Sequence, residues 1–246
     1  MSSMWSFLAN PHRFLVFARY AVPVSYGVGL CLFAWSLYQA LWRVPPDALQ
    51  GGDIIRGMFI HVPSAWLCMG LYLGLAIASF VWFIWRHELA DVAARAIAPI
   101  GATYTALCLV TGAIWGKPTW GTWWLWDDPR IMSVLVLFFL FLGYMALRSA
   151  LETRQRAARA GAILAMVGAV NVPLIKFSVD IWSSLHQGPS VLRAEGPAMA
   201  DVYLHPLLIG FGGQALLVSA MVLTLMRAEI FTQQGDRLMA RRLGES

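Results

Sequence analysis

Long apolar stretches separated by short polar connections dominate the chain. Stretches of about 20 residues with few charged side chains are long enough to cross the hydrocarbon core of a bilayer as helices. On that criterion the sequence contains six spans, at roughly 21–42, 58–85, 94–115, 131–147, 161–180 and 202–226. The pattern predicts an all-α integral membrane protein, a bundle of six transmembrane helices that forms one polytopic domain over residues 1–246.

The residues before the first span predict a short interfacial helix and not a cleaved signal peptide. A basic start, an apolar middle and a small-residue cleavage site do not occur there in that order. The segment instead alternates aromatic and basic side chains: Trp5, Phe7, Arg13, Phe14, Phe17 and Arg19. Such side chains favour the membrane surface.

The basic residues in the connections predict the orientation of the bundle. Arginine is frequent in the N-terminal segment, in the turns 86–95 and 148–159 and in the C-terminal tail. Connections rich in Lys and Arg face the cytoplasm, so both termini are expected there. The longer connections 43–57, 116–130 and 181–201, where bases are offset by acids, then face outward.

The composition excludes several classes of protein. Hydrophobic residues make up 59% of the chain and charged residues 13%, far from the charged quarter of a soluble domain. The pI of about 9.4 reflects basic residues that the membrane topology already explains. We therefore expect contact with membrane lipid and no nucleic-acid partner. Cys31, Cys68 and Cys108 lie inside apolar spans without a C-x-x-C pair, which excludes a disulfide framework and a covalent c-type heme site.

One connection is unusually rich in tryptophan. Between Trp115 and Arg130 the chain reads WGKPTWGTWWLWDDPR, which holds five of its 12 Trp, at 115, 120, 123, 124 and 126. Indoles favour the membrane interface and also stack on flat aromatic molecules. The segment is therefore either an aromatic belt or a platform for a broad planar ligand, and the density of Trp favours the platform.

The spacing of these tryptophans predicts a shared face. Trp120, Trp123, Trp124 and Asp127 follow the i, i+3, i+4, i+7 pattern of a helix. If the segment is helical, three indoles lie together with the acid at their edge. Gly116, Pro118 and Gly121 disfavour a helix, so we expect it to start no earlier than about 119.

Three of the five histidines lie on the outward side. His61 opens the second span, His186 lies in SLHQGPS, and His205 begins the sixth span. Each alone is most simply a polar residue with its hydrogen bonds satisfied, but imidazoles at a membrane boundary often mark sites. Neutral imidazole is also a common axial ligand of heme iron. A tryptophan platform between two histidine-bearing segments makes heme the expected planar ligand.

These segments resemble a known family. WGKPTWGTWWLWD resembles the WWD domain of heme-handling proteins, and NVPLIKFSVDIWSSLHQG with FIHVPSAW is similar to the CcmC family of system I cytochrome c maturation. The resemblance extends over essentially the whole chain. It implies a subunit of the bacterial inner membrane that binds heme at the periplasmic face during c-type cytochrome biogenesis.

The resemblance also implies ligands and partners. The axial ligands of the iron would be His61 and His186, which flank the WWD loop 116–130, and the cofactor would be non-covalent, b-type heme. The expected partners are the ABC-transporter subunits CcmA and CcmB, the small protein CcmD and the heme chaperone CcmE, to which heme is presented. We expect a delivery factor without catalytic residues. The alternatives are a transmembrane heme channel and a heme ligase that acts directly on apocytochromes.

Other outward residues complete the expected site. The ring of heme needs flat apolar side chains, and its propionates need bases. The candidates are Trp115, Trp120, Trp123, Trp124 and Trp126 for the ring, and Arg56, Lys117, Arg130 and Arg193 for the propionates. Each base is equally well explained as an ordinary interfacial residue. His205 is expected to be structural.

The acid of the motif has two possible registers. The family pattern commonly reads W-D-x-R, whereas here Trp126-Asp127-Asp128-Pro129-Arg130 contains an additional residue. Asp127 directly follows Trp126 and is the preferred choice. Asp128 with Arg130 preserves the D-x-R spacing and remains the alternative.

Overall fold

The computed structural model describes residues 10–48, 51–182, 184–186, 188, 190–191 and 193–244, with the side chain of residue 243 excepted. All regular elements of these residues are helices, and one isolated bridge joins Asp47 and Gly52. The elements are α2 (Pro11–Trp42), η2 (Asp53–Gly57), α3 (Met58–Trp85), α4 (Glu88–Trp120), α5 (Pro129–Ser149), α6 (Arg154–Gly168), α7 (Asn171–Ile181) and α8 (Asp201–Gly244). The all-α prediction is confirmed.

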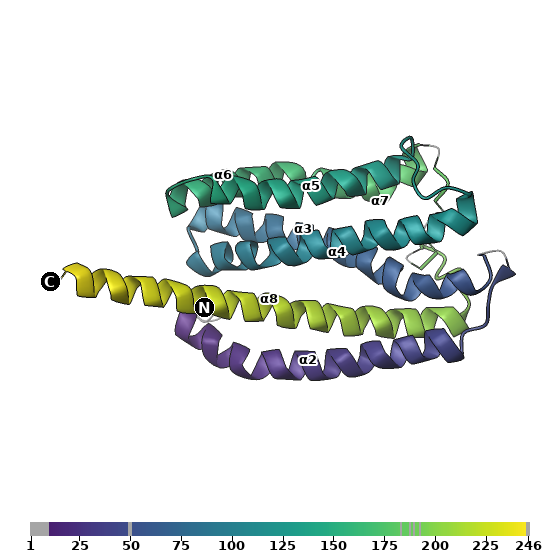
Figure 1. The fold of residues 1–246 in the computed structure, drawn as a ribbon, viewed down its shortest axis with the longest axis horizontal. Helices are drawn as coiled ribbons and strands as arrows, with labels where there is room; N and C mark the ends of the chain where they lie inside the picture. The colour runs from purple at the N-terminus through teal and green to yellow at the C-terminus, as the bar shows by residue number, and fades with distance from the viewer. Residues whose placement is uncertain are drawn as a thin grey trace.

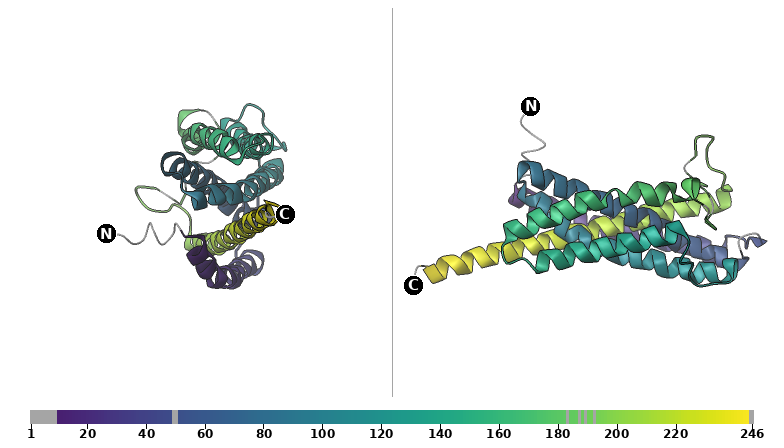
Figure 2. Two further views of the ribbon diagram at one scale, coloured as in Figure 1. Left: turned by 90° about the vertical axis from the view of Figure 1, so that its left-hand side faces the viewer. Right: turned by 90° about the horizontal axis from the view of Figure 1, so that it is seen from above.

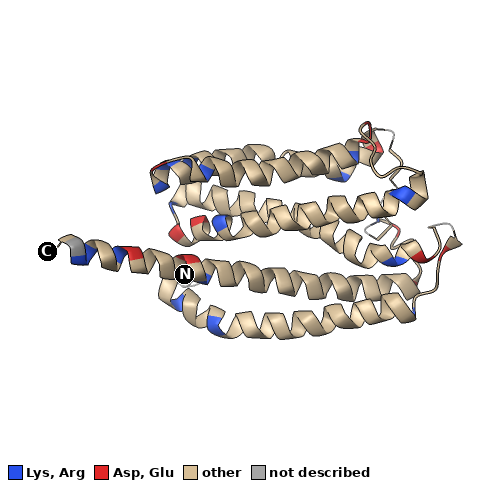
Figure 3. Cartoon of the chain, viewed as in Figure 1, with Lys and Arg blue, Asp and Glu red and all other residues tan. Residues whose placement is uncertain are grey.

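The described residues contain six stretches of helix long and apolar enough to cross a membrane, as predicted. They are Pro11–Trp42, Asp53–Trp85, Glu88–Trp120, Pro129–Ser149, Arg154–Ile181 and Asp201–Arg242. The charged residues lie mainly toward the two ends of the bundle and leave its middle almost uncharged (Figure 3). The chain is a multi-pass membrane protein.

The first span begins earlier than predicted. α2 starts at Pro11 because the Asn10 side chain accepts a hydrogen bond from the His12 N–H at 2.9 Å and caps the helix, with Pro11 suited to its first position. The residues from 11 to 20 therefore continue into the span and do not form a separate interfacial helix. Trp5 and Phe7 of that predicted helix lie outside the described residues.

The helices lie in three rows. α5 lies with α6 and α7 along one side, α3 and α4 occupy the middle, and α8 with α2 forms the other side (Figure 1; Figure 2). The main core fills the space between α3, α4, α5 and α6, where Tyr72, Phe141 and Tyr144 are fully buried. Among the described helices, the first (α2) and the last (α8) are thus direct neighbours.

The fifth span is interrupted between α6 and α7, at Ala169 and Val170. Pro173 has no N–H for the carbonyl of Ala169, and that carbonyl accepts from the Val172 N–H at 3.1 Å instead. The Asn171 side chain donates to the carbonyl of Ser133 on α5 at 2.8 Å. The break therefore occurs where Asn171 and Pro173 predict a kink, and α5 stabilises it.

The beginning of α2 and the end of α8 lie toward the same end of the bundle (Figure 1). The opposite end carries η2, the Trp-rich turn 121–128 and the described residues of the connection 182–200 (Figure 1). We call it the histidine end, because His61 and His186 lie there.

Candidate functional site

The Trp-rich segment is not a new helix. α4 continues through Gly116 and Pro118 to Trp120 and ends at Gly121, whose φ of 79° is left-handed and whose N–H bonds the Lys117 carbonyl at 3.1 Å. Residues 121–128 are turns and bends. The prediction that Trp123, Trp124 and Asp127 share a helical face with Trp120 is therefore wrong, as is the expected start near 119.

The packing of Trp120 explains why α4 remains helical at Gly116. A Cβ at that position would lie 3.0 Å from Cε3 of Trp120, so the missing side chain leaves room for the indole to lie along its own helix. The preference of Gly for irregular structure is only about 1 kcal/mol. The packing of the Trp120 indole outweighs this preference. α4 ends at Gly121, which adopts the left-handed conformation.

His61 lies in the first turns of α3 and faces α4. Its Nδ1 is 3.0 Å from the Thr111 hydroxyl, and its ring meets the edge of the Trp115 indole with centroids 5.8 Å apart. The Thr111 hydroxyl donates to the Leu107 carbonyl at 2.6 Å, so toward His61 it acts as acceptor. Nδ1 then carries the proton, and Nε2 keeps its free lone pair.

The backbone before His61 is held by a residue that sequence reasoning missed. Pro63 cannot donate to the Phe59 carbonyl one turn back. The buried Gln214 of α8 donates to that carbonyl instead, at 3.2 Å. The signal was present in the sequence, because a Pro near the start of one apolar span and a Gln within another both need a hydrogen-bond partner.

His186 lies in the connection after α7 and faces the end of α4. Its Nδ1 is 3.2 Å from Oδ1 and 3.3 Å from Oδ2 of Asp128, and 3.3 Å from the Ser184 hydroxyl. Its ring meets the Trp120 indole edge-on, with centroids 4.8 Å apart. With Nδ1–H donated to the carboxylate, Nε2 again keeps its lone pair.

Asp128 connects this loop to α5. Its Oδ1 accepts from the backbone N–H groups of Arg130 and Ile131, both at 3.0 Å, and caps the helix. Its Oδ2 accepts from the Ser184 hydroxyl at 2.7 Å and from the Leu185 N–H at 3.3 Å. These contacts belong to Asp128, whereas Asp127 is exposed. The geometry thus supports the Asp128-Pro129-Arg130 register over the preferred Asp127.

The protonation states match these hydrogen bonds. Burial lowers the pKa of His186 below the ordinary histidine value of 6.5, although the Asp128 carboxylate opposes the shift. For Asp128, burial alone would raise the pKa. Hydrogen bonds from Ser184, the Ile131 N–H and the His186 ring outweigh burial and lower it. At neutral pH His186 is therefore neutral and Asp128 ionised.

Both histidines contact the same part of α4. Trp115 touches one ring and Trp120 the other, and both indoles belong to the last turns of α4. The structure thus brings together the two predicted ligands and two of the predicted tryptophans.

The other three predicted tryptophans belong to the turn that follows α4. Trp124 packs edge-on against Trp126 with centroids 5.8 Å apart, and its buried Nε1 has no hydrogen-bond partner within the described part of the chain. Trp123 and Trp126 are 57% and 74% exposed. Their exposure leaves them free to contact a ligand or lipid.

The predicted bases have partners within the protein. Arg56 pairs with Asp53 at 3.0 Å and donates to the Leu41 carbonyl. Arg130 donates to the Ser178 hydroxyl at 3.3 Å. The others contact neighbours in sequence: Lys117 the Gly121 carbonyl at 3.1 Å, and Arg193 Glu195 at 3.3 Å.

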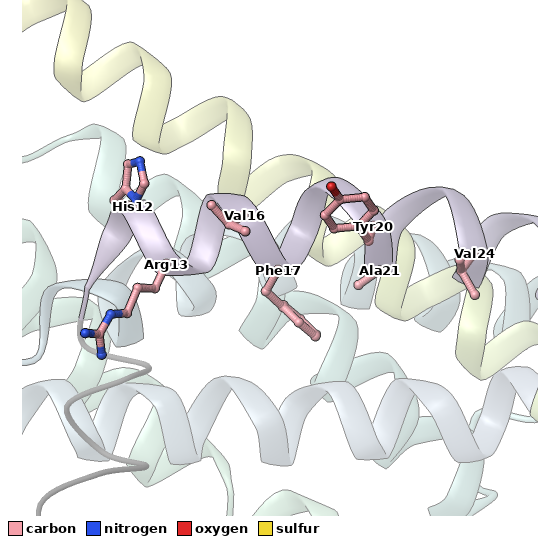
Figure 4. Close-up of a pocket in the computed structure, with 7 residues that line it drawn as sticks. All are labelled: His12, Arg13, Val16, Phe17, Tyr20, Ala21 and Val24. Atoms are coloured by element: carbon pink, nitrogen blue, oxygen red, sulfur yellow. The ribbon is translucent and has the colours of Figure 1, made fainter.

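A separate pocket of about 510 Å³ lies along α2 and is not part of this site. All of its lining residues come from α2: His12, Arg13, Val16, Phe17, Tyr20, Ala21 and Val24 (Figure 4). They lie on the beginning of that helix, at the end of the bundle opposite the histidines (Figure 1). The face of one helix in an apolar span needs no ligand other than lipid.

Comparison with known proteins identifies relatives over most of the chain. Residues 4–241 match the model of the CcmC family, described as heme exporter protein C. A heme exporter protein C of Bradyrhizobium diazoefficiens is 48% identical over 92% of this chain and 85% of its own length. The heme exporter protein C of Paracoccus denitrificans is 40% identical over 97% of this chain and 98% of its own length. That of Escherichia coli K12 is 45% identical over 74% of this chain and 72% of its own length.

Proposed function

The chain belongs to the CcmC family, heme exporter protein C, and on that premise we propose that it holds heme at the histidine end and presents it to a partner. The iron is held between His61 and His186 as axial ligands, and the heme is non-covalent and b-type. The protein is a delivery factor that releases the cofactor unchanged.

One observation carries the proposal. Both imidazoles engage Nδ1 in hydrogen bonds within the protein, with Thr111 for His61 and Asp128 for His186. Each therefore offers a free Nε2, the usual arrangement of a metal-bound histidine whose second nitrogen is held by a neighbour. Bound heme would supply an iron with two open axial positions, and two imidazoles that each contact the last turns of α4 suit it.

The surroundings of the histidines fit a flat apolar ring with acidic substituents. Trp115 and Trp120 border the two imidazoles, and the turn after α4 carries Trp123, Trp124 and Trp126, the further tryptophans proposed for the ring. Arg56, Lys117, Arg130 and Arg193 are the bases proposed for the propionates. We assign the acid of the motif to Asp128 and not to Asp127, since Asp128 contacts His186.

We place the site at the periplasmic face of the bacterial inner membrane, with both termini cytoplasmic. Six crossings put the two termini on one side, and the arginine-rich turns favour the cytoplasm for that side. The proposed partners are CcmA, CcmB and CcmD of the ABC-transporter complex, and CcmE, which receives the heme for c-type cytochrome biogenesis. The exposed Trp123 and Trp126 are the residues proposed to form the accessible edge for that transfer.

Heme retention by the purified protein tests the proposal. His61→Ala and His186→Ala each remove one axial donor, so we expect loss of most of the bound heme and a shifted Soret band in the remainder. His205→Ala, which changes a histidine at the same end of the bundle, should retain heme normally. Wild-type occupancy and spectra in both ligand variants would exclude the axial assignment.

A further inference from the structure

The two candidate ligands differ in the group that accepts the proton of Nδ1. For His61 that group is the neutral Thr111 hydroxyl at 3.0 Å, whose own proton is donated to the Leu107 carbonyl. For His186 it is the Asp128 carboxylate, with its oxygens at 3.2 and 3.3 Å. Hydrogen bonds to an ionised acceptor are roughly twice as strong as neutral ones. A carboxylate partner also makes a metal-bound imidazole more basic.

Asp128 is held rigidly enough to determine the position of its partner. Oδ1 is fixed by the first backbone N–H groups of α5, at Arg130 and Ile131, where a negative charge is favourable. Oδ2 is fixed by Ser184 and the Leu185 N–H, from the chain just before His186. One buried carboxylate therefore links a rigid helix to the loop that carries the ligand.

We propose that Asp128 is a positioning residue that holds His186 with its proton on Nδ1, presents Nε2 to the iron and makes His186 the stronger of the two axial donors. The proposal rests on the proposed function, because the role of His186 as ligand belongs to it. It assigns to Asp128 two tasks, capping α5 and orienting His186, which can be separated by substitution.

Asp128→Asn separates them, because Asn caps a helix about as well as Asp but carries no charge. We expect heme affinity to fall roughly 10- to 100-fold, the usual effect of losing such a partner. The midpoint potential of the remaining heme should rise, because the ferric state loses the more basic donor. Asp127→Asn, which removes the same charge from the neighbouring exposed residue, is the matched control and should change both quantities little.

Two results of these measurements would overturn the proposal. One is an Asp128→Asn protein with wild-type affinity and potential, and the other is an equal change in Asp127→Asn. Thermal unfolding of each variant shows whether capping of α5 is preserved. If the Asn variant accumulates poorly, Asp128→Ser also caps a helix without a carboxylate and gives the same two readouts.

A measurement on heme-free protein keeps the proposal apart from the proposed function. With ¹⁵N-labelled histidine, nuclear magnetic resonance reports which nitrogen of His186 carries the proton. We expect Nδ1–H in the wild type and a shift toward Nε2–H in Asp128→Asn. An unchanged tautomer would reject the role of Asp128 whether or not heme binds. A wild-type protein that binds no heme would instead reject the proposed function and leave this tautomer result standing.

Discussion

At the scale of single residues, small and polar neighbours determine how the histidines can act. Thr111 and Asp128 fix the protonated nitrogen of each imidazole, and Gly112 leaves room for His61, since a Cβ there would lie 3.0 Å from its Cε1. A search of the sequence for His and Trp finds the candidate ligands but not these neighbours. Asp127 is exposed and Asp128 is buried, and the contacts of Asp128 with Ser184 and His186 depend on the packing of a distant loop.

The tryptophans differ in importance at this scale. Trp120 contacts His186, whereas Trp42 at the end of α2 is 68% exposed and stacks only on Tyr38 among the ring contacts of the described residues. Since an aromatic contact contributes about 1 kcal/mol, Trp120→Ala should weaken heme binding by roughly fivefold or more, with normal membrane insertion. Trp42→Ala is the control and should bind heme normally. Impaired insertion with unchanged heme affinity in Trp120→Ala would instead support an aromatic belt.

At the scale of elements, the site is built where local preference and packing disagree. Gly116 and Pro118 disfavour a helix, yet α4 passes both and delivers Trp120 to His186. Sequence reasoning could not predict this, because the gain comes from an indole folded onto Gly116 and from a loop far along the chain. The break near Asn171 and Pro173 was predictable, since a missing N–H is a local property.

The start of α3 provides a prediction for an element. Gln214→Leu leaves the Phe59 carbonyl without its donor, so we expect a lower unfolding temperature, corresponding to about 1 kcal/mol, and weaker heme retention through the displaced His61. Pro63→Ala restores an N–H that can bond this carbonyl within the helix. The double variant should therefore recover stability. If Gln214→Leu lowers the unfolding temperature equally whether residue 63 is Pro or Ala, Gln214 does not act through the Phe59 carbonyl.

At the scale of the whole molecule, the membrane makes part of the fold predictable. Every span must bond its own backbone in lipid, so apolar length alone identifies six helices. The neighbours of each helix were not predictable, because positions that face lipid and positions that face another helix are equally apolar. Only the structure shows that α2 packs against α8 (Figure 1). It also shows that His61 of α3 and His186 of the connection after α7 both contact α4.

The most direct test of axial ligation by two imidazoles is electron paramagnetic resonance of the ferric, heme-loaded protein. The wild type should give a low-spin spectrum of six-coordinate iron with two imidazole ligands. His61→Ala and His186→Ala should each convert the bound heme to a high-spin form, while His205→Ala keeps the wild-type signal. A high-spin wild type, or a low-spin spectrum that survives in both ligand variants, would contradict heme binding between His61 and His186.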